Sequence, residues 1–361
     1  MTTVSTVPLP ATIAAVDGRW LTAALRDSGV IGPVARVATV QARRIALETG
    51  FSSELYRLRL TGDDGVPASV VVKMPTGTAV REAMDLVGGY RREVMFYERV
   101  AGRAPLGTPR VYAARMAEAS SDFVLVLEDL GDWENADHLA GLSVARARQC
   151  IAQLADLHAW SARAANADLL RDFPSLDAPV TRQVFPLLFA EGWRVYRERA
   201  RTPVPAAVAG FAEHFAEHTA TALGALTERR CLVHGDIRAD NLFFRDGQIV
   251  VVDFQLASLA AGPVDIGYLV SQGLTTAERG GRDEELLRGY VERLAEAGVG
   301  DYGFDQAWRH YRFAVAFFLL FPVIAVRGWE LLPARARELC LCLIERSVAA
   351  IEEIDALAVF A

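Results

Sequence analysis

Alternation of hydrophobic and polar residues marks the first third of the chain and predicts half-buried β-strands there. The segments that alternate or form short apolar runs are residues 35–47, 54–60, 68–73, 110–114 and 123–127. Residues 80–100 instead carry apolar side chains at helical spacing, and the Gly88-Gly89 pair is expected to divide that helix into two pieces. The predicted structure of residues 1–130 is an antiparallel five-stranded sheet with a helix.

The pattern then changes to helical periodicity and stays helical for most of the remaining chain. Residues 142–164 form the clearest amphipathic helix. The helical pattern is interrupted once, where two short apolar strands, Leu242–Phe244 and Ile249–Val252, are expected. We therefore predict an α+β protein of two lobes, residues 1–130 and the larger, mostly helical residues 131–361.

Composition is that of an ordinary soluble globular protein. The chain has 361 residues, of which 52% are hydrophobic and 23% are charged. Its net charge of −7 does not favour nucleic acid as a partner, because phosphates attract basic surfaces. The four cysteines show no metal-ligand spacing, and the first residues do not resemble a signal peptide. These features predict free thiols and a cytoplasmic location.

The longest apolar run covers residues 313–326 and is interrupted by Pro322. Its fourteen residues are too few to span a bilayer, whose hydrocarbon core needs about 20 helical residues. We therefore expect a buried helix with a kink at the proline, and no segment that crosses a membrane.

The sequence HGDIRADN, followed by VVDFQ, carries the residues that indicate a chemistry. Asp236 follows His234-Gly235, Asn241 lies five residues after it, and Asp253 lies twelve residues after Asn241. In a phosphoryl-transfer site, one aspartate orients the attacking hydroxyl and accepts its proton, while an asparagine and a second aspartate hold magnesium. Hard oxygen ligands suit Mg²⁺, which takes only one or two protein carboxylates. The spacing predicts a kinase-like site with Asp236 as catalytic carboxylate and Asn241 and Asp253 as metal ligands.

Lysine usage gives a second indication. Lys73 is the only lysine among the 38 basic residues of the chain, and it ends the strand-like run SVVVK. A lysine ammonium is a compact point charge, whereas the arginine guanidinium is a wide planar fork. A nucleotide site uses such a point charge to reach the phosphates from the end of a strand. Chance survival of one lysine in an arginine-rich sequence is the alternative explanation.

These residues together resemble the aminoglycoside phosphotransferase and choline kinase superfamily, and especially its ecdysteroid-kinase-like branch. The stretches that carry the resemblance are GFSSELYRLRL with VVVKMP, YRREVMFYERV, FVLVLEDLG, HGDIRADNLFF with VVDFQLAS, and GPVDIGYLV. The resemblance implies a bilobal protein-kinase-like fold. Residues 1–130 would bind the nucleotide, and residues 131–361 would carry the catalytic residues and bind the acceptor.

The resemblance also implies several binding residues. The YRREVMFYE pattern favours Glu93 over its rivals Glu82 and Glu98 as the partner of Lys73. A loop at residues 49–53 would cover the phosphates, with backbone N–H groups and Ser52 or Ser53 as donors. Near the hinge at residues 128–133, the Glu128 carbonyl and the Leu130 N–H would bind adenine. His234 is expected to be structural, and Asp265 to cap a helix or support the catalytic loop.

One position departs from the family pattern. In the ecdysteroid-kinase-like branch a tryptophan is expected two residues after the catalytic aspartate, whereas this chain has Arg238. Arg238 would either stabilise charge in the transition state, or be solvated at the cleft mouth or paired with Asp240. This departure affects the choice of acceptor more than the reaction class.

The resulting expectation is an ATP-dependent, Mg²⁺-requiring kinase that phosphorylates a hydroxyl of a small lipophilic metabolite, sterol-like or polyketide-like. An antibiotic of the aminoglycoside or macrolide type, or an amino alcohol, is the alternative acceptor. A nucleotide-binding pseudokinase is the alternative from another class, although the lysine and both aspartates are present. The acceptor wall is sought among five aromatic residues of the helical lobe: Phe185, Trp193, Tyr196, Trp308 and Phe317. The sequence does not indicate an oligomeric state.

Overall fold

The structure is a computed structural model that describes residues 8–45, 52–77 and 79–361. The chain divides into two compact units, each described by itself below. Unit 1 comprises residues 1–103 and 108–132, and unit 2 comprises residues 104–107 and 133–361. The functional roles assigned above to residues 1–130 and 131–361 stay predictions.

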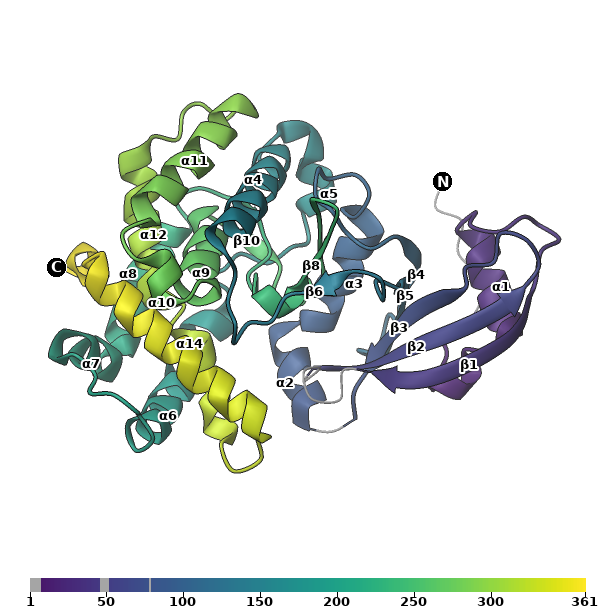
Figure 1. Ribbon diagram of the computed structural model, residues 1–361, viewed down its shortest axis with the longest axis horizontal. Helices are drawn as coiled ribbons and strands as arrows, with labels where there is room; N and C mark the ends of the chain where they lie inside the picture. Colours follow the sequence, from purple (N-terminus) through teal and green to yellow (C-terminus); the bar gives the residue numbers. More distant parts are fainter. Residues whose placement is uncertain (1–7, 46–51, 78) are drawn as a thin grey trace. The chain divides into compact units, whose positions relative to one another are not determined.

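Unit 1 is built on the antiparallel five-stranded sheet that the sequence predicts (Figure 1). Its strands are β1 (Val37–Ile45), β2 (Ser53–Gly62), β3 (Ser69–Pro75), β4 (Val111–Met116) and β5 (Phe123–Glu128). The order across the sheet is β1-β2-β3-β5-β4. β3 is therefore an inner strand, and Lys73 on it lies opposite Leu125 of β5 and Leu55 of β2.

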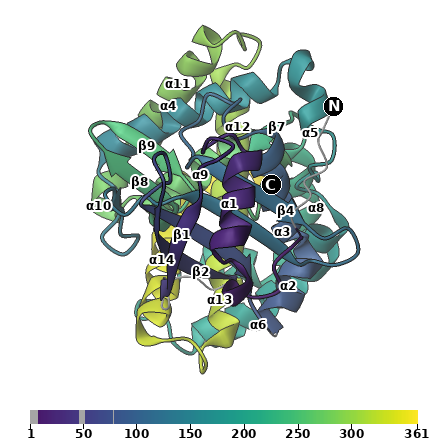
Figure 2. The same ribbon diagram turned by 90° about the vertical axis from the view of Figure 1, so that its right-hand side faces the viewer.

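A helix that the sequence analysis did not predict, α1 (Gly18–Asp27), covers one face of this sheet (Figure 2). The side chain of Asp17 caps it by accepting the Trp20 N–H at 2.8 Å. Its buried residues share a core with alternate residues of the strands, including Val70 and Val72 of β3.

The predicted helix over residues 80–100 is divided as expected at the glycine pair. It consists of α2 (Ala79–Val87) and α3 (Gly89–Arg99). Gly88 between them has φ +66°, in the left-handed region that favours glycine. α3 packs against β4 and β5 and presents a run of buried residues to the sheet.

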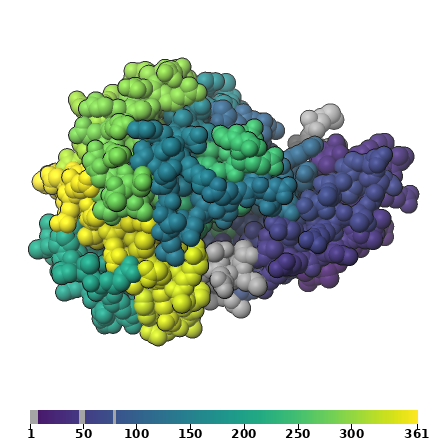
Figure 3. Space-filling view, in the orientation of Figure 1, coloured from purple at the N-terminus to yellow at the C-terminus, as the bar shows by residue number. Residues whose placement is uncertain are grey.

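Unit 2 is mostly helical, as predicted. Its helices are α4 (Val144–Ser161), α5 (Ala167–Leu170), α6 (Phe185–Arg197), α7 (Ala206–Glu213), α8 (Phe215–Leu226), α9 (Pro263–Gly273), α10 (Thr276–Arg279), α11 (Asp283–Glu296), α12 (Phe304–Phe317), α13 (Leu320–Ala325) and α14 (Ala334–Glu353). α9 is buried along its whole length and contacts α4, α12 and α14. α14 lies on the outside of this group, where part of it is exposed (Figure 3).

Short strands and turns interrupt the helices of unit 2. The strands are β6 (Glu134–Asn135), β7 (Cys231–Val233), β8 (Leu242–Arg245), β9 (Gln248–Val251) and β10 (Ser258–Ala260). β6, β8 and β9 form one sheet, and β10 and β7 form another. β8 and β9 are the two strands that the sequence predicts around the HGD motif. The short 3₁₀ or π segments of unit 2 are η2 (Ala164–Asn166), η3 (Val180–Val184), η4 (Ala239–Asn241), η5 (Val326–Gly328) and η6 (Ala356–Phe360), and η1 (Ile13–Ala15) precedes α1 in unit 1.

The apolar run near Pro322 is an interrupted helix. α12 ends at Phe317 and α13 begins at Leu320, so the break precedes the proline. Proline lacks an N–H and clashes with the carbonyl four residues earlier, here that of Phe318, which explains where the helix stops. Length and composition alone would let Phe304–Gly328 cross a membrane, but 67% of its most apolar window is buried inside the structure. A helix in the core of a protein can be equally long and apolar, so length and composition alone are weak evidence for a membrane span.

Candidate active site

Lys73 lies on the face of the unit 1 sheet that is opposite to α1. Its neighbours Val72 and Met74 belong to the core under α1, and successive side chains of a strand alternate between faces. Lys73 is 5% exposed, and its Nζ donates to Oε1 of Glu93 on α3 at 2.8 Å. The buried amine therefore has a buried carboxylate within hydrogen-bond distance as its counter-ion.

This geometry distinguishes Glu93 from the other glutamates considered as partners. Glu93 is 1% exposed, whereas Glu82 on α2 and Glu98 near the end of α3 are exposed side chains. The predicted Lys73–Glu93 ion pair is therefore present. Its action on nucleotide phosphates stays a prediction.

The predicted phosphate-covering loop is described only in part, because residues 49–51 lie outside the described residues. The carbonyl of Ser52 accepts a hydrogen bond from the hydroxyl of Tyr90, which is on α3 three residues before Glu93. Ser53 begins β2, and its side chain is buried. The start of β2 is thus tied to the helix that carries Glu93, and the contacts of both serines with phosphate stay predictions.

The predicted adenine-binding stretch follows β5. Glu128 ends that strand, and its N–H donates to the Arg110 carbonyl at 2.8 Å. Leu130 is buried. Asp129, between them, accepts the Gly131 N–H at 3.1 Å and lies 2.8 Å from Nε of Arg57. The stretch is therefore braced against β2, and its contacts with a nucleotide base stay predictions.

In unit 2, the HGD motif leaves β7 in a tight turn. The N–H groups of His234 and Gly235 donate to the two carboxylate oxygens of Asp265, at 2.7 and 2.9 Å. Gly235 has φ +80°, and a Cβ there would lie 2.4 Å from the Leu256 carbonyl oxygen. Glycine is required at this position both for its backbone conformation and for the close approach of the chain segments.

The side chain of His234 connects the HGD turn to the segment that follows β9. Its Nδ1 accepts the Asp236 N–H at 3.1 Å, and its Nε2 lies 3.0 Å from the Val252 carbonyl. These partners assign the neutral tautomer that carries its proton on Nε2. His234 also packs against Phe254, with ring centroids 4.6 Å apart. The histidine is structural, as expected, and connects the Asp236 loop to the segment that contains Asp253.

Asp265 is completely buried and supports the catalytic loop from α9. Besides its two backbone donors, it lies 3.1 Å from Nε2 of His158 on α4. The Nδ1 of His158 lies 3.0 Å from the hydroxyl of Tyr290 on α11. Of the two roles considered for Asp265, the structure supports the second, because Gly262 occupies the N-cap of α9.

Asp236 lies just after this turn, with its side chain 20% exposed. Its Oδ1 accepts a hydrogen bond from the Tyr268 hydroxyl at 3.1 Å. Its Oδ2 lies 3.5 Å from Nδ2 of Asn241, which donates more closely to the Asp236 carbonyl, at 2.9 Å. Burial raises the pKa of Asp236, while the charge of Arg238 and the Tyr268 hydrogen bond act to lower it.

Arg238 is paired with Asp236, the predicted catalytic carboxylate. Its Nε lies 3.1 Å from Oδ1 of Asp236, an ion pair without hydrogen-bond geometry. The pairing with Asp240 that the sequence analysis considered is not formed. Oδ1 of Asp240 accepts the His138 N–H at 3.0 Å instead. The negative charge of Asp236 raises the pKa of Arg238, so the guanidinium remains charged.

Asn241 and Asp253 present the donors for a cation. The Asn241 amide nitrogen donates to the Asp236 carbonyl, so its side-chain oxygen is the atom that would bind the predicted cation. Asp253 has φ +68°, uncommon for a residue other than glycine, and follows Val252, whose N–H donates to the Asn241 carbonyl at 3.0 Å. No group of three or more His, Cys, Asp or Glu that could hold a metal occurs among the described residues. A carboxylate and an amide oxygen fit Mg²⁺, which completes its shell with water and phosphate.

Comparison with known families agrees with this geometry. The model of the ecdysteroid kinase-like family matches residues 48–298, which is more than half of the chain. The chain belongs to the ecdysteroid kinase-like family. It is therefore a small-molecule kinase of the aminoglycoside phosphotransferase and choline kinase superfamily. Comparison with curated protein sequences gives no match.

Solved structures with the same fold are distant in sequence. Choline kinase from Cryptosporidium parvum Iowa II aligns with a TM-score of 0.55 at 11% identity, over 88% of this chain and 90% of that chain. Plasmodium vivax ethanolamine kinase aligns with a TM-score of 0.51 at 12% identity, over 85% of this chain and 82% of that chain. The GDP complex of wild-type aminoglycoside 2′-phosphotransferase IIIa gives 0.53 at 12% identity, over 87% and 93%. At these identities the similarity shows a shared fold, and it does not indicate an acceptor.

Sequence reasoning missed three residues of this ecdysteroid kinase-like site: Tyr268, His158 and His138. Tyr268 lies three residues after Asp265 and so shares its helix face, a spacing that was open to detection. His138 is buried, and its Nδ1 accepts the Ala239 N–H of the catalytic loop at 2.9 Å. His158 lies 107 residues before Asp265, and no local pattern indicates that they meet.

The predicted acceptor wall requires correction. Tyr196 and Phe317 are 1% exposed and belong to the helical core, so the prediction is wrong for these two. Trp193 is 3% exposed and lines a hollow of about 390 Å³ together with Arg197 and Arg201, and its role in an acceptor wall stays a prediction. Trp308 stacks between Phe304 and Tyr311. Aromatic residues at helical spacing are more often core than pocket, and their spacing alone does not separate the two cases.

Phe185 remains a candidate for the acceptor wall, because ring contacts connect it through Phe321 to Tyr268, which contacts Asp236. The ring of Tyr268 lies 5.6 Å from that of Phe318 and 6.1 Å from that of Phe321. Phe321 in turn lies edge-on to Phe185 at 6.3 Å. Phe318 is buried, whereas Phe321 and Phe185 are partly exposed. Two partly exposed aromatic side chains are therefore connected by ring contacts to Tyr268, which contacts Asp236.

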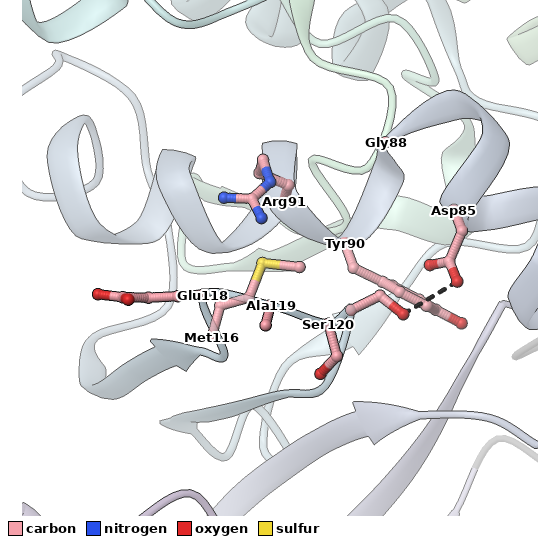
Figure 4. A pocket seen from close by; sticks show the side chains of 9 residues that line it. Asp85, Gly88, Tyr90, Arg91, Met116, Glu118, Ala119 and Ser120 are labelled. Atoms are coloured by element: carbon pink, nitrogen blue, oxygen red, sulfur yellow. Dashed lines mark hydrogen bonds between the residues drawn. The ribbon is translucent and has the colours of Figure 1, made fainter.

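Unit 1 also has a shallow hollow of about 310 Å³ beside the α2–α3 junction and the β4–β5 turn (Figure 4). It is lined by Asp85, Gly88, Tyr90, Arg91, Met116, Glu118, Ala119, Ser120 and Ser121. Ser121 donates to Asp85 across it at 2.9 Å. Its lining mixes both signs of charge with hydroxyl groups, which favours neither an anionic nor an apolar ligand.

Proposed function

We propose that this kinase transfers the γ-phosphate of ATP to a hydroxyl group of a small, lipophilic, hydroxylated metabolite, sterol-like or polyketide-like. The observation that carries the proposal is the setting of Asp236. One of its oxygens is held by Tyr268, and its loop is bonded directly to Asn241 and, through His234, to the segment of Asp253. A kinase site of this class needs a catalytic aspartate close to an asparagine and a second aspartate that hold the metal, here Asp236, Asn241 and Asp253.

Each side chain has a role that its geometry supports. Asp236 would accept a hydrogen bond from the acceptor hydroxyl, orient it and take its proton as transfer proceeds. Arg238, charged and beside Asp236, would stabilise negative charge on the phosphoryl group. Lys73, paired with Glu93, would bind the nucleotide phosphates. Asn241 and Asp253 would hold Mg²⁺, which when bound supplies positive charge against those phosphates.

A lipophilic acceptor is favoured by the partly exposed aromatic side chains that ring contacts connect to Tyr268. A pocket for an apolar ligand is lined mainly by hydrophobic and aromatic groups, with a few polar groups that fix orientation. Phe321 and Phe185 would supply the hydrophobic lining, and Asp236 would supply the polar group that orients the hydroxyl. An aminoglycoside would require several acidic side chains at the same surface.

The proposal is tested with a panel of acceptors by measuring the release of ADP from MgATP and of GDP from MgGTP. The panel should contain hydroxylated sterols, polyketides, macrolides, aminoglycosides and amino alcohols. We expect turnover with a sterol or polyketide hydroxyl, and its loss in Asp236→Asn with nucleotide affinity retained in calorimetry. Turnover confined to aminoglycosides or amino alcohols would reject the lipophilic acceptor. Nucleotide binding without turnover on any member would instead support a pseudokinase.

A further inference from the structure

Tyr268 contacts the catalytic carboxylate from the most deeply buried helix of unit 2. Its side chain is 2% exposed and its hydroxyl donates to Oδ1 of Asp236 at 3.1 Å. Burial, followed by the charge of Asp236, raises the pKa of Tyr268 well above its ordinary value. The phenol therefore remains protonated and acts as a donor throughout the physiological range.

The other groups near Asp236 do not fix the orientation of its carboxylate. Arg238 lies at 3.1 Å from the same oxygen, but without hydrogen-bond geometry, so it contributes charge. Asn241 lies at 3.5 Å from Oδ2 and makes its shorter bond to the backbone carbonyl of Asp236. Among the described residues, Tyr268 thus donates the shorter side-chain hydrogen bond to this carboxylate, and Oδ2 has the longer contact with Asn241.

The position of Tyr268 is itself well determined. α9 is buried along its length, and Gly267 lets α12 approach so closely that a Cβ there would lie 3.0 Å from Cβ of Ala314. The phenol ring is enclosed by Phe318 and Phe321. One turn earlier on α9, Asp265 holds the backbone of His234 and Gly235. The same helix therefore fixes both the main chain of the catalytic loop and the carboxylate at its end.

We infer that Tyr268 is a positioning residue, which holds Asp236 by Oδ1 and so presents Oδ2 to the acceptor hydroxyl. This inference rests on the proposed function. A carboxylate free to rotate about χ2 would spend part of its time with neither oxygen directed at the hydroxyl. Restricting that rotation contributes to turnover and not to ground-state affinity, because the acceptor is oriented by the carboxylate only as it reacts.

The first test compares Tyr268→Phe with the wild-type protein. This change removes the hydroxyl and keeps the ring that packs on Phe318 and Phe321. We expect kcat to fall on the order of 10- to 100-fold, with KM for MgATP and for the acceptor within about twofold. The probes are MgATP with the best acceptor of the panel, and MgATP with water as acceptor. Unchanged kcat would overturn the inference, since a packing role alone is satisfied by phenylalanine.

Tyr311→Phe is the matched control. Tyr311 is also fully buried, and its hydroxyl donates to a carboxylate, that of Asp283, at 2.7 Å. This control loses the same kind of bond elsewhere in unit 2. We expect it to lower the melting temperature at least as much as Tyr268→Phe and to leave kcat within about twofold. An equal loss of kcat in both variants would mean that general loosening of unit 2 is responsible, and would overturn the inference.

The second test is a double-mutant cycle with Asp236→Asn. If Tyr268 acts through Asp236, adding Tyr268→Phe to Asp236→Asn should change the residual turnover by less than about twofold. Additive losses would show that Tyr268 acts on the substrate itself, and would overturn the positioning role. Failure of the wild-type protein with every acceptor would reject the proposed function together with this inference. An active wild type with an equally active Tyr268→Phe would reject the inference alone.

Discussion

In unit 1 the site lysine is paired with one buried side chain, whereas in unit 2 the site aspartate and its loop are fixed by groups from several segments. Lys73 has Glu93 on α3. The Asp236 loop has donors and acceptors from α9, from the segment after β9 and from the His138 stretch. A pair of opposite charges holds a cation that needs only to be near phosphates. A reacting carboxylate needs orientation, and orientation requires several directed bonds.

This difference predicts different responses to substitution. In unit 1, removing one charge of the Lys73–Glu93 pair takes the opposite charge at 2.8 Å away from a buried ion, which is costly. In unit 2, several hydrogen bonds hold the Asp236 loop. Asp265 holds its main chain, and Tyr268 holds the Asp236 carboxylate. The predictions below test that contrast, beginning with the largest effect.

Lys73→Arg should reduce kcat/KM for MgATP on the order of 100-fold, with the fold intact. The guanidinium is wider than the ammonium and must fit a position that is only 5% exposed beside Glu93. Steady-state kinetics and circular dichroism measure the two effects. Arg115→Lys is the control, since it makes the reverse change in β4 of the same sheet at a residue paired with Asp27. Near-normal turnover in Lys73→Arg would contradict a point-charge role.

Gly235→Ala should destabilise unit 2 by about 3 kcal/mol or more and lower kcat. An added Cβ would collide with the Leu256 carbonyl oxygen at 2.4 Å, in addition to the cost of its positive φ. Gly247→Ala measures the cost of the positive φ alone, because Gly247 has φ +76° but nothing within 4 Å of its Cβ position. We expect Gly247→Ala to lower the free energy of unfolding by about 1 kcal/mol and to leave turnover normal. Equal losses in urea unfolding would show that the close approach at the HGD turn is unimportant.

Glu93→Gln should cost about 3 kcal/mol of unfolding free energy, because it leaves the buried Lys73 ammonium facing a neutral amide. Asp122→Asn in the same unit is the control, as Asp122 is half-exposed where it pairs with Arg81. Exposed pairs contribute less than about 1 kcal/mol. Urea unfolding measures both values. Similar small losses would mean that unit 1 tolerates the loss of the Glu93 charge beside Lys73, and the proposed contrast between the units would fail.

Several elements could be predicted from sequence because their signals are local. Strand alternation located β1 to β5, and the glycine pair divided α2 from α3. The HGD spacing placed Asp236, Asn241 and Asp253 around β8 and β9. The pairing of Lys73 with Glu93 came from family resemblance combined with strand and helix positions.

What could not be predicted depends on contacts distant in sequence. α1 has helical spacing, but its stability comes from a sheet face assembled from strands as far away as β5. The spacing of Tyr268 from Asp265 shows that they share a helix face, but no local pattern shows that this face meets the HGD turn, where Tyr268 contacts Asp236. Tyr196 and Phe317 have the same spacing whether they line a pocket or fill the core. Burial decides between these cases, and burial is a property of the whole unit.

The smallest predicted effect is a pH dependence confined to unit 2. Burial, with the positive charges of Arg238 and Arg346, lowers the pKa of His138 to about 3. In the unfolded chain its pKa is about 6.5, so below that pH the unfolded state binds a proton that the folded state does not. Stability is therefore complete above about pH 6.5 and falls as the pH decreases toward 3. The loss at pH 5 should be about 2 kcal/mol.

His138→Asn isolates this contribution. An asparagine side chain offers an acceptor where Nδ1 of His138 receives the Ala239 N–H, but it does not titrate. Urea unfolding at pH 7 and pH 5 should show a smaller pH difference in the variant than in the wild type. His310, whose pKa is also lowered by burial, is present in both proteins and cancels in the comparison. An unchanged difference would mean that His138 accepts a proton within the fold. The catalytic loop would then be held less firmly than its several bonds suggest, and the contrast with the Lys73–Glu93 pair would weaken.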